Sequence, residues 1–267
     1  MKWKDYLEEN IDPDDVDIKN VAVKDNLDPV IWDDRLNLKN YLAEHLYKIA
    51  KDFFKTLDLD WNLVEDVTLT GSLANYNWSK YSDVDLHLIV DYAEVDENEK
   101  LVKDFFRNAS AMWNRTHKIT VKGHDVELYV QDSKEPHHST GVYSIKYDRW
   151  NNTPTKYDPQ IDKESLKKKS AKWMNDIDEV YELLAVKDYK TANEQSERLM
   201  KKLKKYRQGG LEKGGEHSIE NLVFKVLRRN DYLQRLSNLR IVSYDNMMTV
   251  NGGIGSEIIK ISLNETN

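Results

Sequence analysis

The chain contains no cysteine among its 267 residues. This absence excludes disulfide bonds, cysteine-ligated zinc, iron–sulfur clusters and a thiol nucleophile, and it fits a reducing compartment. Glycine and proline are scarce, at 10 and 5 residues, which excludes collagen-like and low-complexity proteins. No run approaches the roughly 18 apolar residues of a membrane-spanning helix, and the N-terminus lacks the apolar core of a signal peptide. We therefore expect a soluble, cytoplasmic protein with no membrane partner.

Aromatic residues are abundant, with 15 Tyr, 7 Trp and 5 Phe, and they predict a folded chain with a substantial core. The net charge of −7 argues against a general nucleic-acid coat. The charge is uneven, however, because residues 163–240 hold 19 Lys and Arg against 12 Asp and Glu. One interpretation of this uneven charge is that both regions are simply solvated surfaces. The other is that the basic half faces phosphates, while clustered carboxylates elsewhere in the chain hold cations.

Hydrophobic spacing predicts an α+β fold, in which a mixed sheet with flanking helices is followed by an α-helical bundle. We expect strands over 64–70 and 83–90, and a hairpin of 118–121 with 126–130. We expect helices over 36–57 and 97–114, the second with Leu101, Phe105 and Met112 facing inward. The predicted divisions are an acidic N-terminal extension (1–30), a catalytic domain (31–158), the helical domain (159–245) and a flexible tail (246–267).

Within the helical domain we expect three apolar stripes, the last of which starts at an N-cap, Ser218, and runs to Leu236. Gly209-Gly210 and Gly214-Gly215 are expected to separate the last two helices. The stretch 131–160 reads as mostly loop, with one short apolar piece near 142–147.

The segment from Leu69 to Leu88 carries the most specific chemical signal. A strand ends in Gly71-Ser72, ten residues follow, and Asp83-Val84-Asp85 opens the next strand. Glycine lets a backbone approach a phosphate, and the serine hydroxyl and following amides can donate to phosphate oxygens. Residues two apart on a strand share a face, so Asp83 and Asp85 can ligate one Mg²⁺ through hard oxygen ligands.

A third carboxylate would complete a two-metal site, and the strand 126–130 offers one. Val126, Leu128 and Val130 form its apolar face, which places Glu127 on the other face. Asp125 lies on the same side but at the turn. We favour Glu127, because a carboxylate among apolar strand residues is costly and a functional role would explain it. Asp125 remains the alternative.

These residues together resemble the nucleotidyltransferase (polymerase-beta-like) superfamily over roughly residues 36–132. The matching positions are Gly71, Ser72, Asp83, Asp85 and Glu127, although the family usually has Asp at the third carboxylate. More loosely, 66–91 and 207–236 resemble predicted nucleotidyltransferases encoded by tailed bacteriophages, for which the compartment would be the host cytoplasm.

The resemblance implies Mg²⁺-dependent (or Mn²⁺-dependent) transfer of a nucleoside monophosphate from an NTP, with release of pyrophosphate. The acceptor stays open among an RNA end, a protein hydroxyl, a small molecule and a second nucleotide. The alternatives are a catalytically inactive nucleotide- or RNA-binding module of the same fold and, less favoured, a metal-dependent phosphohydrolase.

Several further side chains are weaker candidates. Lys201 and Lys205 belong to a basic helical stripe that could hold the NTP triphosphate, although such a stripe is more often a solvated face. His87 shares the strand face of the aspartates, and His137-His138 follow the third carboxylate strand; both read first as packed or loop histidines. The aromatic candidates for stacking on a base, with core packing as the commoner role, are Trp78, Tyr81 and Trp150.

Overall fold

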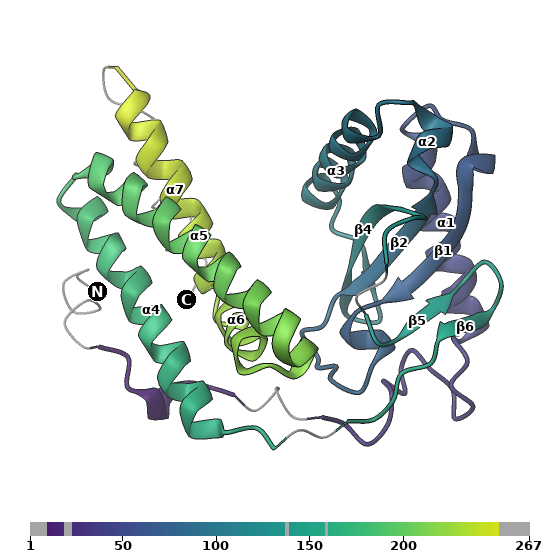
Figure 1. Cartoon of the computed structure of the whole chain (residues 1–267), viewed down its shortest axis with the longest axis horizontal. Coiled ribbons are helices and arrows are strands. Elements are labelled where there is room, and N and C mark those ends of the chain that lie inside the picture. The colour runs from purple at the N-terminus through teal and green to yellow at the C-terminus, as the bar shows by residue number, and fades with distance from the viewer. Residues whose placement is uncertain (1–9, 19–22, 137–138, 158–159, 251–267) are drawn as a thin grey trace. The chain divides into compact units, whose positions relative to one another are not determined.

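Figure 1 shows the computed structural model of the chain, which describes residues 10–18, 23–136, 139–157 and 160–250. The chain divides into two compact units, one of residues 22–158 and one that combines residues 1–21 with residues 159–267. The first unit holds a mixed sheet with helices, whereas the described part of the second holds helices alone. The predicted α+β class is therefore confirmed.

The sheet has six strands in the order β3-β4-β2-β1-β5-β6. Its strands are β1 (Val64–Thr70), β2 (Val84–Val90), β3 (Thr120–Val121), β4 (His124–Asp132), β5 (Val142–Ser144) and β6 (Arg149–Asn152). The pair β2–β4 is parallel and all other pairs are antiparallel. A parallel pair needs a crossover connection, which α2 (Tyr92–Val95) and α3 (Glu99–Thr116) provide here.

The central strands alternate, so each presents one apolar and one polar face. On β2 the side chains of Leu86 and Leu88 are fully buried, while those between them are half-buried. The apolar face lies under α1 (Asn40–Lys55) and α3, and Phe54 of α1 stacks on Phe106 of α3 with ring centroids 6.4 Å apart. The polar face carries the candidate site.

The inward face predicted for α3 was wrong by one helical position. Leu101, Phe105 and Met112 are exposed, at 61%, 45% and 61%. The buried positions are instead Val102 and Phe106. Because the helix carries two adjacent apolar stripes, periodicity alone could not choose between them; the ring of Phe106, which packs on Phe54 and Tyr92, decides the rotation.

The stretch predicted as mostly loop contains two short strands, β5 and β6. Tyr143 of β5 is buried and meets the Trp150 ring of β6 edge-on at 5.1 Å. Strands of three and four residues are too short to show an alternating pattern, so the sequence showed only an apolar piece at β5.

The N-terminal segment, predicted as one acidic extension, is shared between the two units. Leu27, near the end of the predicted extension, is buried in the core of the α+β unit, as are Ile31 and Trp32 directly after the extension. Val16 is buried in the core of the helical unit, where the Ile11 amide donates to Asn175 Oδ1 at 2.8 Å. Acidic composition hid these apolar anchors, which are spaced too irregularly to form a periodic stripe.

The helical unit contains α4 (Lys163–Ala185), α5 (Tyr189–Gly214), α6 (Ile219–Arg229) and α7 (Tyr232–Met248). Ser218 caps α6 as predicted, since its Oγ accepts from the Asn221 amide. The third predicted stripe is two helices, because Asp231 adopts a left-handed conformation with φ 61° and turns the chain between α6 and α7.

The glycine pairs of the helical unit behave differently from one another. Gly209-Gly210 lie inside α5 and do not end it, contrary to prediction; the helix ends at Gly214-Gly215 as expected. A Cβ on Gly210 would lie 2.4 Å from Glu220 Cβ, so this glycine permits close packing of α5 against α6. The predicted tail begins within α7, and residues 251–267 lie outside the described residues. None of the helices in the described ranges has the length and apolar character that crossing a membrane requires.

Candidate active site

The parallel register of β2 and β4 places Asp85 directly beside Glu127. Neighbouring strands lie about 4.8 Å apart and register partners project to the same face. The antiparallel register of β1 with β2 puts Thr70, the last residue of β1, on the other side of Asp85. Asp85 thus stands in the middle of the polar face, between the end of β1 and the carboxylate on β4.

Gly71 brings the backbone directly against Asp85. Its φ of 74° is unfavourable for residues with a side chain, and a Cβ there would lie 1.8 Å from Asp85 Oδ2. The predicted Gly-Ser turn and the predicted Asp-x-Asp strand therefore meet in space. The glycine is required by both its backbone angle and the space that the carboxylate occupies.

The side chain of Tyr129 lies close enough to all three predicted carboxylates to feel their charges. Its hydroxyl donates a hydrogen bond to Glu127 Oε2. The pKa of Tyr129 lies well above its ordinary value because of burial, the hydrogen bond to Glu127, and the negative charges of Glu127, Asp85 and Asp83. All three predicted carboxylates thus act on one hydroxyl group.

The donor set is chemically suited to a divalent cation. Carboxylate oxygens are hard ligands of the kind that Mg²⁺ prefers, and Asp85 Oδ2 lies directly against the backbone of Gly71. Nevertheless, within the described ranges no group of three or more His, Asp or Glu side chains is arranged to hold a metal ion. Glu127 is turned along its strand toward Tyr129. Because a carboxylate has two oxygens, Glu127 can accept this hydrogen bond through Oε2 and offer Oε1 to a cation.

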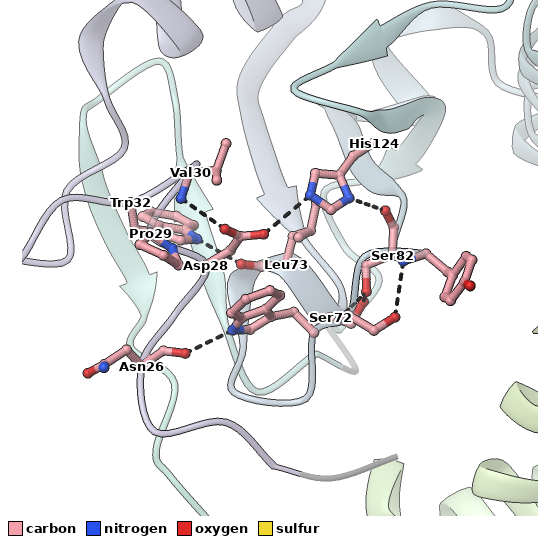
Figure 2. Close-up of polar contacts among 12 residues, drawn as sticks. Asn26, Asp28, Pro29, Val30, Trp32, Ser72, Leu73, Ser82 and His124 are labelled. Carbon is pink, nitrogen blue, oxygen red and sulfur yellow. Dashed lines mark hydrogen bonds and ion pairs between the residues drawn. The ribbon is translucent and has the colours of Figure 1, made fainter. Parts of the chain in front are cut away.

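A buried polar network holds the ends of the motif in place, as Figure 2 shows. Ser72 Oγ donates to Ser82 Oγ at 2.8 Å, which also accepts from the Ser79 amide at 2.9 Å. His124 Nδ1 meets the carbonyl oxygen of Ser82 at 2.7 Å. Ser82, the residue before Asp83, therefore links the Gly-Ser turn to the first residue of β4.

The far side of the His124 ring is occupied by a carboxylate. Nε2 lies 3.2 Å from Asp28 Oδ2, and both side chains are at least 94% buried. A carbonyl oxygen only accepts, so Nδ1 carries a proton, and the contact at Nε2 needs a second proton on either His124 or Asp28. The pair is therefore joined by a buried hydrogen bond.

Asp28, Ser82 and His124 were not singled out by the sequence analysis. Asp28 was counted with the acidic extension and His124 with the hairpin turn. Ser82 lies next to Asp83 inside the motif, which was the one available signal. The main-chain carbonyl of Leu73 also accepts from Trp32 Nε1, at 2.7 Å, so a second N-terminal side chain braces the same turn.

The weaker candidates have structural partners. His87 Nδ1 lies 3.0 Å from Gln131 Oε1, and its ring contacts that of Tyr129. Trp78 Nε1 donates to the Asn26 carbonyl, and Trp150 stacks on Trp32 at 4.7 Å. These contacts agree with the packed reading of the three residues.

The remaining candidates lie elsewhere or are not described. Tyr81 is half-exposed. Lys201 and Lys205 are exposed on α5 of the helical unit, and Lys201 pairs with Glu197 at 3.6 Å. Their role toward a triphosphate stays a prediction. His137-His138 lie outside the described residues.

Comparison of the chain with models of protein families, with curated proteins and with solved structures found no match. The case for a function therefore depends on the geometry of the site and on the motif itself.

Gly71→Ala and Gly123→Ala form a matched pair, since both glycines have positive φ. A Cβ at Gly123 meets nothing within 4 Å, so Gly123→Ala is expected to cost only the left-handed backbone penalty of about 1–2 kcal/mol. Gly71→Ala adds overlap with Asp85, typically another ~1–3 kcal/mol. Urea denaturation of both variants measures the difference; equal losses would show that the Gly71–Asp85 approach is not tight.

Asp28→Ala is expected to destabilise the α+β unit by about 3 kcal/mol, because it leaves the buried His124 without its partner. The matched control is Asp25→Ala in the same segment, whose side chain is 92% exposed and pairs with Lys156. That pair is exposed to solvent, so its loss should leave stability almost unchanged. Urea denaturation midpoints of the two variants measure the difference. Similar stabilities of Asp28→Ala and Asp25→Ala would show that the Asp28–His124 pair does not stabilise the unit.

Proposed function

We propose that the chain is a nucleotidyltransferase that moves a nucleoside monophosphate from an NTP to an acceptor hydroxyl, with release of pyrophosphate. One observation carries the proposal: Asp85 lies beside Glu127 because of the strand register, and the backbone of Gly71 lies directly against Asp85. A turn that admits close backbone approach lies beside acidic groups that suit divalent cations, which is the arrangement that a triphosphate with its cations needs.

Each residue has a proposed role in this reaction. Asp83, Asp85 and Glu127 would hold Mg²⁺ or Mn²⁺, which when bound would supply charge neutralisation and hydroxyl activation. Gly71 would let the backbone of the turn approach phosphate oxygens, and Ser72 would donate to them through its amide and, once released from Ser82, through its hydroxyl. Glu127, once released from Tyr129, can accept the proton of the acceptor hydroxyl.

The rate enhancement in this scheme comes from positioning. Phosphoryl-type transfer needs little covalent help from the protein, so rigid placement of the triphosphate and the acceptor dominates. The buried hydrogen bonds of Asp28, His124 and Ser82 serve that purpose, because they fix the turn and the start of β2 relative to one another. The acceptor class, whether an RNA end, a protein, a small molecule or a nucleotide, is left for the assay to identify.

Asp83→Ala and Asp85→Ala are expected to abolish transfer without unfolding the protein. The loss should exceed the roughly 10–100-fold that removal of an outer-shell partner costs. Each variant is incubated with an α-phosphate-labelled NTP, Mg²⁺ or Mn²⁺ and a cell extract, and RNA, protein and small-molecule fractions are separated. The control is Asp52→Ala on α1, an exposed carboxylate remote from the motif.

Label that follows one fraction in the wild type and in Asp52→Ala, and is lost in the two site variants, would support the transferase and name its acceptor. Full transfer by either site variant would refute the proposal. Thermal melts of all four proteins separate loss of chemistry from loss of fold.

A second candidate is a module of the same fold that binds a nucleotide or RNA without transferring anything. The hydrogen bond from the Tyr129 hydroxyl favours it, because that bond occupies Glu127 Oε2, one of the oxygens that would hold a cation. This candidate predicts NTP binding with no pyrophosphate formed, so a pyrophosphate measurement in the same reactions distinguishes the two functions.

A further inference from the structure

The helical unit contains a pocket of about 620 Å³ whose lining belongs to that unit alone. One wall is a stripe of α5 at helical spacing, from Met200 through Leu203 and Arg207 to Leu211. The opposite wall is formed by Phe224 of α6 and by two leucines of α7, Leu233 and Leu236. A volume of this size lies within the range of small-molecule sites, which is roughly 300–1,000 Å³.

The lining combines an apolar interior with positive charge, and none of its described residues is acidic. Its residues are Met200, Leu203, Lys204, Lys205, Arg207, Gln208, Leu211, Phe224, Leu233 and Leu236. Lys204 and Lys205 are exposed, and neither forms an ion pair with a residue in the described part of the chain. Three cations beside an apolar surface are complementary to an anion that carries an apolar body.

Arg207 is held in a fixed orientation at this pocket. Its Nε donates to Asn221 Oδ1 at 3.1 Å, and its guanidinium carbon lies 4.3 Å from the centroid of the Phe224 ring. Asn221 is itself buried. A guanidinium that is already ordered loses less conformational freedom when an anion binds, which favours binding.

We infer that this pocket binds a small amphiphilic anion, in which an apolar chain or ring carries one phosphate or carboxylate group. The apolar body lies against Phe224 and the leucines, and the anionic group meets Lys204, Lys205 and Arg207. A bare inorganic anion would leave the apolar walls uncovered, and a neutral apolar molecule would leave Lys204 and Lys205 without a counter-charge. This inference does not depend on the proposed nucleotidyl transfer.

Isothermal titration calorimetry of the full chain tests it with four probes. Octyl phosphate and 1-naphthyl phosphate represent the chain and the ring, while inorganic phosphate and 1-octanol carry only the charge or only the apolar body. We expect one equivalent of octyl phosphate or naphthyl phosphate to bind, at least about tenfold more tightly than phosphate or octanol. Equal binding of inorganic phosphate, or no binding of either organic phosphate, would overturn the inference.

Two double variants of α5 locate the site. Lys204→Ala/Lys205→Ala should weaken organic phosphate binding about tenfold, since two charge-assisted contacts are lost. Lys190→Ala/Lys213→Ala removes the same charge from exposed positions of the same helix outside the pocket and should leave affinity unchanged. Equal weakening in both pairs would show attraction to net charge alone and would contradict a site at this pocket.

A third variant, Leu211→Trp, places a bulkier ring in the apolar part of the pocket and keeps all three cations. It should weaken binding of the organic phosphates while its melting temperature stays near that of the wild type. Unchanged affinity in a folded Leu211→Trp protein would place the ligand elsewhere and refute the assignment.

Discussion

The parallel pairing of β2 with β4 is the constraint on which the candidate site depends. Parallel strands need a crossover, and the segment that contains α3 provides it while covering the apolar face of the sheet. With that face buried, a shift of one residue in the register would turn the apolar side chains to the wrong side. The register that buries Leu86 beside Leu128 therefore also fixes Asp85 beside Glu127 on the opposite face.

The second constraint is a set of buried hydrogen bonds by which the N-terminal segment holds the turn after β1 in place. Asp28 and Trp32 come from a part of the chain whose composition is acidic, yet both are buried against the α+β unit. Through His124 and Ser82 the Asp28 carboxylate is connected to the residue before Asp83, and Trp32 holds the carbonyl of Leu73. The acidic segment thus has a structural role close to the motif in addition to its contribution to surface charge.

Much of the central architecture could be predicted from the sequence, because it follows from local patterns. A β-rich run predicted the strand that became β1, alternation predicted β2 and β4, and the spacing of Gly71, Asp83 and Asp85 predicted that a turn and an acidic strand would meet. Periodicity could not predict helix rotations, helix breaks or close helix packing, because these depend on tertiary contacts. The rotation of α3 depends on the packing of Phe106, the break between α6 and α7 depends on the left-handed Asp231, and the close packing of α5 on α6 depends on Gly210. The Asp28–His124 pair joins residues 96 positions apart, a distance at which no local pattern carries information.

The central claim is that Asp85 and Glu127, made neighbours by strand register, hold divalent cations together with a nucleotide. The most direct test is electron paramagnetic resonance titration of Mn²⁺ in the presence of a non-hydrolysable NTP, with Asp85→Asn, Glu127→Gln and Asp125→Asn compared with the wild type. The account predicts Mn²⁺ binding that needs the nucleotide, is weakened about tenfold or more by the first two substitutions, and is little changed by Asp125→Asn. Unchanged Mn²⁺ affinity in folded Asp85→Asn and Glu127→Gln proteins would contradict it.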